Sequence, residues 1–236
     1  MTDEPEQRRR MVRPPVGGLE AGRGMGTRLK TAEDRSLSSQ QWLERQLNDP
    51  YVKAAKAKGY RSRAAFKLSE IDDRHHLIKR GMKIVDLGCA PGGWLQVAVQ
   101  RGAGRVVGID LLEVDPLNGV ELILGDFTDP KMGPLLIGTL GGAPDIVMSD
   151  MAPNTVGHRQ TDHLRIVMLI EAAADFAIEV LKPGGIFVTK AFQGGETAEV
   201  LRTLKAHFDA VRHVKPKASR QDSSEVYLLA TGFRGR

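Results

Sequence analysis

The residues that decide the fold are Val85-Asp86-Leu87-Gly88-Cys89-Ala90-Pro91-Gly92-Gly93-Trp94. A short apolar run at 83–88 enters a glycine-rich turn, and a helical pattern over about 92–101 follows. In doubly wound α/β folds, the turn between the first strand and the first helix is where nucleotide-like ligands bind. The pattern therefore predicts an α/β protein with a ligand site at this turn.

Strands and helices alternate through the rest of the chain. Further β-rich runs lie at 105–110, 121–125, 145–150, 185–192 and 225–231. Helical patterns occupy about 162–181 and 195–207, and the first of these ends at the stop signal Lys182-Pro183-Gly184-Gly185. Apolar strands that alternate with helices predict a mainly parallel, doubly wound sheet.

The beginning of the chain has a different composition. Residues 1–37 are rich in Arg, Gly and Pro, lack hydrophobic periodicity and predict a disordered basic arm. We expect 38–236 to form one domain, in which a helical segment at 38–80 precedes an α/β core at 81–236. In the helical segment, Phe66, Leu68, Ile71 and Leu77 have amphipathic helical spacing.

The net charge of +5 is unevenly distributed. Residues 1–67 hold 15 Lys and Arg against 8 Asp and Glu, 68–201 hold 11 against 18, and 202–236 hold 8 against 3. If folding brings the two basic ends together, they form a positive face that suits a polyanion, although basic tails can also be merely solubilising. The single Cys89 excludes an internal disulfide, and no stretch resembles a signal peptide or a membrane span. We expect a soluble cytoplasmic protein without membrane partners.

A basic stretch with interleaved aromatic residues precedes the core. Residues 51–68 contain six Lys or Arg and no acid, together with Tyr51, Tyr60 and Phe66. Cations contact phosphates, and aromatic rings stack on exposed bases, but the helical spacing of Phe66 favours a place in the core. The candidate RNA contacts are Lys53, Lys56, Lys58, Arg61 and Arg63, with help from Lys215, Lys217 and Arg220.

Acidic residues stand at the ends of the second and third strands. Asp110 lies 22 residues after Gly88, where a carboxylate can accept hydrogen bonds from a ribose diol. Asp126 is placed to meet an adenine amino group, although either Asp could be only a turn former. Ala90 replaces the glycine that makes room for a pyrophosphate, which disfavours an NAD-linked oxidoreductase. S-adenosylmethionine, a methyl donor, carries no phosphate and needs no such room. It is therefore the ligand that we expect at this turn.

Lys190 interrupts an otherwise apolar strand. A lysine there is seldom buried without a partner or a task, unless the strand is an edge strand and the lysine faces solvent. Asp150 ends the preceding strand, and Glu225 begins a strand that could run antiparallel. We therefore expect Lys190, Asp150 and Glu225 to meet at one edge of the sheet, beside the methyl donor.

Five motifs in order resemble the FtsJ/RrmJ (RlmE) family of ribose 2′-O-methyltransferases, over about 40–233: SRAAFKL, DLGCAPGGW, SDMAPN, VTKAFQG and SSEVYLLATG. The resemblance implies a Rossmann-like, S-adenosylmethionine-dependent methyltransferase fold with a mainly parallel seven-stranded sheet and an antiparallel last strand. It also implies methylation of a uridine ribose in 23S rRNA of the large ribosomal subunit. A tRNA ribose methyltransferase of the same family is the alternative. We expect a monomer whose partner is ribosomal RNA or the large subunit.

The resemblance also implies site residues. The family's Lys-Asp-Lys-Glu tetrad falls on Lys67, Asp150, Lys190 and Glu225, with Lys190 as the proton acceptor. Its donor-binding positions fall on Gly92, Trp94, Asp110, Asp126 and Asp150, to which the glycine turn adds Gly88 and Gly93. No metal site is expected. Because a free lysine amine is protonated at neutral pH, Lys190 could be a neutral general base or a charged group that orients the hydroxyl. A non-catalytic RNA-binding module remains a rival; it predicts no loss of function when Lys190 becomes Ala.

Overall fold

The computed structural model describes residues 47–152, 159–193 and 198–235, and the chain divides into two units, 1–50 and 51–236. The predicted arm at 1–37 and the domain boundary expected at 38 lie outside the described residues. Within the described ranges, no helix is long and apolar enough to cross a membrane. The same ranges contain no group of three or more His, Cys, Asp or Glu side chains placed to hold a metal ion.

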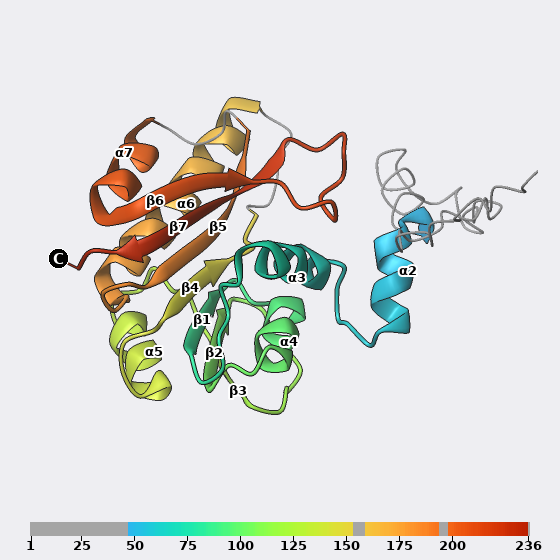
Figure 1. The fold of residues 1–236 in the computed structure, drawn as a ribbon, viewed down its shortest axis with the longest axis horizontal. Helices are drawn as coiled ribbons and strands as arrows, with labels where there is room; N and C mark the ends of the chain where they lie inside the picture. The colour runs from blue at the N-terminus through green and yellow to red at the C-terminus, as the bar shows by residue number, and fades with distance from the viewer. Residues whose placement is uncertain (1–46, 153–158, 194–197, 236) are drawn as a thin grey trace, which may run out of the picture. The chain divides into compact units, whose positions relative to one another are not determined.

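A seven-stranded sheet forms the centre of the second unit, with the strand order β3-β2-β1-β4-β5-β7-β6 (Figure 1). The strands are β1 Lys83–Leu87, β2 Arg105–Asp110, β3 Val120–Leu124, β4 Ile146–Ser149, β5 Ile186–Phe192, β6 Phe208–Val214 and β7 Glu225–Phe233. Strands β1 to β5 pair in parallel, and β7 runs antiparallel to both β5 and β6. The mainly parallel sheet with an antiparallel last strand is therefore confirmed. Strand order reverses between β1 and β4, where open α/β sheets bind ligands.

Helices cover both faces of this sheet. The covering helices are α3 Ala64–His75, α4 Gly93–Gln100, α5 Met132–Leu140, α6 Arg159–Val180 and α7 Ala198–His207; a further helix, α2 Pro50–Ala57, precedes them in the chain. Leu68 of α3 and Leu95 of α4 belong to one apolar cluster, which Tyr227 of β7 joins. Helices α5, α6 and α7 contribute to the other cluster, on the opposite face. Alternating strand residues supply the two clusters, as a sheet buried on both faces requires.

Two elements were missing from the sequence patterns. Strand β6 was not predicted because it is an edge strand, paired only with β7, and its middle is half-exposed or exposed. Helix α5 was not predicted because its sequence, MGPLLIGTL, contains two glycines and a proline, which disfavour helix. The helix forms because Leu136 and Leu140, one turn apart, are both fully buried in the core.

Candidate active site

Lys190 and Asp150 meet at the carboxyl edge of β4 and β5. The Lys190 Nζ atom lies 3.0 Å from Asp150 Oδ1 and donates a 2.7 Å hydrogen bond to the Asp150 backbone carbonyl. The Lys190 side chain is only 9% exposed, and β5 lies inside the sheet between β4 and β7. Lys190 is therefore a buried, partnered lysine, and the edge-strand interpretation is wrong.

Lys67 and Glu225 complete the charged cluster. Lys67 reaches it from α3, and its Nζ atom lies 2.7 Å from Glu225 Oε2 and 3.9 Å from Asp150 Oδ1. Glu225 Oε1 accepts a 2.6 Å hydrogen bond from the Ser219 hydroxyl, so both carboxylate oxygens are held. Burial by itself would raise the pKa of Glu225, but Lys67, Ser219 and Lys190 together lower it. The structure thus brings the four predicted residues together in one network of alternating charge.

Tyr227 belongs to this network, although no sequence argument singled it out. Its hydroxyl donates a 2.6 Å hydrogen bond to Asp150 Oδ1, and the Lys67 Nζ atom lies 5.8 Å from the centre of its ring. Burial, followed by the negative charge of Asp150, raises the pKa of the Tyr227 phenol, so it remains a donor at neutral pH. The sequence did contain a signal for Tyr227. It stands two residues after Glu225, and residues two apart share one face of a strand.

The glycines of the turn make room for neighbouring protein atoms. A Cβ atom at Gly88 would lie 2.0 Å from Met151 Cγ, and one at Gly92 would lie 2.8 Å from a guanidinium nitrogen of Arg61. Both glycines also have positive φ angles, of 70° and 104°, which side chains disfavour. The turn therefore requires glycine for its own packing, whatever ligand it holds.

Gly93 and Trp94 open α4 at the end of this turn. A Cβ atom at Gly93 would lie 2.4 Å from Ser62 Oγ. The indole of Trp94 is buried, and its N–H donates a 2.9 Å hydrogen bond to the Ala64 carbonyl. The Trp94 side chain thus holds α3 against α4. What this turn can offer a ligand is its backbone N–H groups, which lack intrahelical partners at a helix start.

Asp110 and Asp126 are both fixed by backbone amides. Asp110 Oδ2 accepts a 2.8 Å hydrogen bond from the Ala90 N–H, and its Oδ1 accepts one of 2.9 Å from the Leu112 N–H. Asp126 is exposed, and its Oδ1 accepts from the amide and the hydroxyl of Thr128. Each Asp110 oxygen keeps a second lone pair, and these bonds use only one of the two Asp126 oxygens, so they orient both groups without exhausting them.

Asp86, inside the turn motif, was not a candidate in the sequence. It is 1% exposed, and neither carboxyl oxygen has a hydrogen-bond partner in the described structure. Burial is the main cause that raises its pKa well above the ordinary value, and the charges of Asp150 and Asp110 add to it. A buried carboxyl without a partner is unusual and calls for a physical reason.

The lysines expected to contact RNA are exposed: Lys53, Lys56 and Lys58. The Lys58 Nζ atom lies 5.4 Å from the ring centre of Phe66. Phe66 packs edge-on against Tyr51 and Tyr60, with ring centres 5.5 and 5.4 Å away. Phe66 is half-buried and belongs to neither apolar cluster of the sheet, so the core position that its spacing predicted is not confirmed. The three aromatic residues pack on one another instead, beside Lys58.

The two arginines expected to contact RNA are engaged within the protein. The Arg61 guanidinium donates 2.7 Å hydrogen bonds to the carbonyls of Asp115 and Pro116. Arg63 donates to the carbonyl of Ala218. Arg61 therefore joins the loop after β2 to the glycine turn, and Arg63 joins α3 to the segment between β6 and β7. That either arginine also contacts RNA stays a prediction.

Fold, site and comparison with known proteins define the class of this protein, an α/β methyltransferase. Residues 60–233 match the family model described as FtsJ-like methyltransferase. The chain belongs to this family.

Similar proteins cover nearly the whole chain. A ribosomal RNA large subunit methyltransferase E from Caulobacter vibrioides is 66% identical over 226 residues, which is 96% of this chain and 100% of the relative. One from Gluconobacter oxydans is 61% identical over 206 residues, 87% of this chain and 77% of the relative. Among solved structures, one named as a ribosomal RNA methyltransferase from Plasmodium falciparum is 33% identical, with a TM-score of 0.66. The match covers 75% of this chain and 100% of that one.

Proposed function

We propose that this enzyme transfers a methyl group from S-adenosylmethionine to the 2′-hydroxyl of a uridine ribose in 23S rRNA of the large ribosomal subunit. The observation that carries the proposal is the convergence of four largely buried side chains beside the glycine turn: Lys67, Asp150, Lys190 and Glu225. Relatives named for the large ribosomal subunit, at 66% identity, support the substrate class.

The residues at the strand ends fit this donor. Asp110 is held in place to accept hydrogen bonds from a ribose diol, and Leu111 and Leu112 beside it are about two-thirds exposed, which suits an adenine ring. The orphan carboxyl of Asp86 suits a cationic ligand group. When bound, S-adenosylmethionine supplies a methyl group on a sulfonium, which an oxygen nucleophile displaces to leave a neutral thioether.

Lys190 is the residue proposed to engage the proton of the ribose hydroxyl. Asp150 fixes the amine through two acceptors, and Tyr227 fixes Asp150 in turn. A pre-positioned group of this kind lowers the barrier mainly through alignment. Lys190 then acts either as a neutral base that takes the proton or as a charged donor that orients the oxygen and stabilises its developing charge. A rate-versus-pH profile separates the two roles, because only the neutral base requires a basic-side rise.

The exposed lysines of the 53–58 segment are proposed to contact RNA phosphates. Binding through such contacts weakens as salt increases, because each contact releases counterions. Lys215 and Lys217, also exposed, lie in the connection that Arg63 joins to α3, and they would extend the same basic surface.

The experiment that tests the function is incubation with a methyl-labelled donor and unmethylated large subunits, free rRNA or tRNA. Mapping of the modified nucleotide then identifies the acceptor atom. We expect label on one uridine ribose of large-subunit rRNA. Label on a tRNA ribose would identify tRNA as the substrate in place of rRNA. Label on a base would overturn the proposed ribose chemistry.

A further inference from the structure

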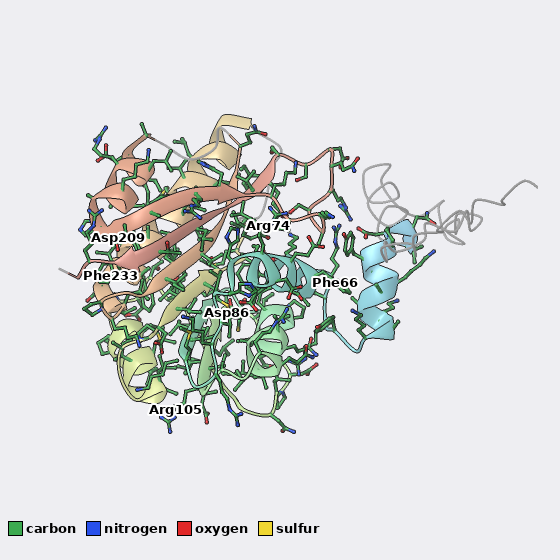
Figure 2. The ribbon with its side chains drawn as sticks, in the orientation of Figure 1. Phe66, Arg74, Asp86, Arg105, Asp209 and Phe233 are labelled. Atoms are coloured by element: carbon green, nitrogen blue, oxygen red, sulfur yellow. The ribbon has the colours of Figure 1, made fainter. Side chains whose placement is uncertain are left out.

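Arg61 lies between the proposed RNA contacts and the donor side of the molecule. It follows the 53–58 segment closely, and Figure 2 labels Phe66 in the first turn of α3, the helix that the chain enters next. The Arg61 backbone N–H donates a 2.7 Å hydrogen bond to Gln96 Oε1 of α4. The side-chain amide nitrogen of Gln96 donates a 2.9 Å hydrogen bond to the Gly59 carbonyl. The backbone between the lysines and α3 is therefore bonded to α4.

The guanidinium of Arg61 reaches the loop that follows β2. Its two terminal nitrogens donate 2.7 Å hydrogen bonds to the carbonyls of Asp115 and Pro116. One of these nitrogens also donates a longer hydrogen bond, of 3.4 Å, to the Pro91 carbonyl in the glycine turn. A planar fork of donors suits several fixed carbonyls, whereas a lysine ammonium is a point charge on a flexible stem. Arg61 thus holds the loop to the turn through its shape as well as its charge.

The loop that Arg61 holds, residues 111–118, has little support of its own. Val114 and Leu117 are half-buried, and the other residues of the loop are exposed. A cavity of about 320 Å³ lies between the loop and the end of β3, lined by residues 112–116 and 122–124. A segment with few buried contacts opens at a small free-energy cost. The hydrogen bonds from Arg61 therefore contribute much of what keeps this loop closed.

We propose that Arg61 is a positioning residue that couples donor binding to RNA binding. This inference rests on the proposed function, because it takes an adenosyl donor and an RNA acceptor. The loop carries Leu111 and Leu112, which suit the adenine ring, and its other part is bonded to Arg61. RNA held by the exposed lysines keeps the connected backbone, and with it the Arg61 guanidinium, in place. Each ligand stabilises the closed loop that the other requires, so each should raise the affinity for the other by the same factor.

The test compares RNA affinity with and without an unreactive donor product. A 23S rRNA transcript is titrated into the wild-type protein by filter binding, either alone or with saturating S-adenosylhomocysteine. RNA should bind at least about fivefold more tightly when S-adenosylhomocysteine is present. The affinity for S-adenosylhomocysteine, measured by calorimetry, should rise by the same factor when RNA is present. Equal RNA affinities in the two conditions would overturn the inference.

Arg61→Lys separates the geometry of the fork from its charge. The lysine keeps a positive charge for phosphate contacts, so RNA affinity without S-adenosylhomocysteine should stay within about threefold of wild type. Because the lysine cannot hold both carbonyls, the gain in RNA affinity on adding S-adenosylhomocysteine should fall below about twofold. A gain as large as that of wild type would contradict the role of Arg61.

Tyr60→Phe is the matched control for Arg61→Lys. It removes the 2.8 Å hydrogen bond that the neighbouring hydroxyl donates to Gln100 of α4, but it keeps the aromatic ring and the contacts of Arg61 with the loop. The gain in RNA affinity should therefore equal that of wild type. If Tyr60→Phe lost as much of this gain as Arg61→Lys, the coupling would not depend on the guanidinium, and the inference would be wrong.

Hydrogen exchange of the wild-type protein gives a readout that requires no variant. RNA alone should slow exchange of the amides at 111–118 by at least about threefold, although this loop is not part of the proposed RNA surface. Unchanged exchange in the loop would overturn the inference even if a variant failed to fold. Wild type that did not bind S-adenosylhomocysteine would refute the proposed donor and this inference with it. Binding of both ligands without coupling would refute the inference alone.

Discussion

Ser219 shows how the site depends on a residue that touches no reacting atom. It is 3% exposed, and its hydroxyl holds the Glu225 oxygen that Lys67 does not reach. Glu225 in turn fixes Lys67 within 3.9 Å of Asp150. A single buried hydroxyl therefore sets the orientation of one side of the tetrad.

Ser219→Ala should lower methyl transfer by about three- to tenfold, because a freer Glu225 positions Lys67 less well, and it should cost about 1 kcal/mol of stability for the lost hydrogen bond. The measurement is kcat under saturating donor, together with donor affinity, which should stay unchanged. Ser224→Ala is the control, since Ser224 is exposed in the same segment. Equal effects of the two variants would contradict the positioning role.

Glu225 also predicts a pH dependence of stability. Its pKa is lowered in the folded state, so its ionised form contributes stability that is present above the ordinary pKa of about 4.3 and is lost as pH falls through the folded value. Glu225→Gln should therefore be about 1–3 kcal/mol less stable than wild type at pH 7, and this difference should shrink toward pH 3. Melting curves across this range check the sign. A difference that grows on acidification would be inconsistent with the ion pair.

For single residues, the sequence predicts which charged side chains belong to the site, but it does not predict which contacts they make. Lys190 was detectable because a charge interrupts an apolar strand, and Asp150 because it ends one. Lys67 came only from the resemblance, since no spacing connects α3 to a strand end. Ser219 and Asp86 could not be predicted, because their importance lies in a contact made, or left unmade, between elements distant in sequence.

Among the elements, α4 and the segment before α3 pack so closely that Gly93 admits no side chain. A Cβ atom there would lie 2.4 Å from Ser62 Oγ, whereas Gly138, in α5, has no atom within 4 Å of its Cβ position. Gly93→Ala should cost about 1–3 kcal/mol through overpacking. Gly138→Ala should add about 0.5–1 kcal/mol through helix propensity. Denaturant unfolding of both variants measures the change in the free energy of unfolding, which should have opposite signs. An unchanged free energy for Gly93→Ala would show that the segment around Ser62 moves aside at little cost.

Arg61 and the exposed lysines lie close together in sequence, but their substitutions should affect different properties of the protein. Charge reversal at Lys53, Lys56 and Lys58 should weaken RNA binding by at least about tenfold and reduce its salt dependence, with donor affinity intact. Arg61→Met should instead lower stability and donor affinity, because it releases the carbonyls of Asp115 and Pro116. Filter binding and calorimetry separate the two outcomes. Loss of donor affinity in the lysine variant would show that the segment with Lys53, Lys56 and Lys58 has a structural role instead.

The main elements of the fold were predictable because the buried strands leave a strong apolar signal. The observed bounds of the six predicted strands lie within two residues of the expected ones. The apolar signal is weak in an element that buries only one of its sides. Strand β6 carries polar residues along an edge, and α5 depends on two buried leucines within a glycine-containing segment.

Over the whole second unit, basic segments far apart in sequence meet. Arg63 bonds the Ala218 carbonyl, and Glu70 accepts a 3.1 Å hydrogen bond from the Ala218 N–H. The basic stretch at 51–67 is thereby tied to the one that contains Lys215 and Lys217. The charge distribution suggested this meeting, but only the path of the chain between β6 and β7 could establish it.

The central claim is that Lys190 acts directly on the methyl acceptor, and transfer by Lys190→Ala and Lys190→Met tests it most directly. Methyl transfer from labelled donor to unmethylated large subunits should fall by about 10²- to 10⁴-fold in both variants. Affinities for S-adenosylhomocysteine and for RNA, measured on the same preparations, should remain within about threefold of wild type. Transfer near the wild-type rate, with both ligands still bound, would contradict the account.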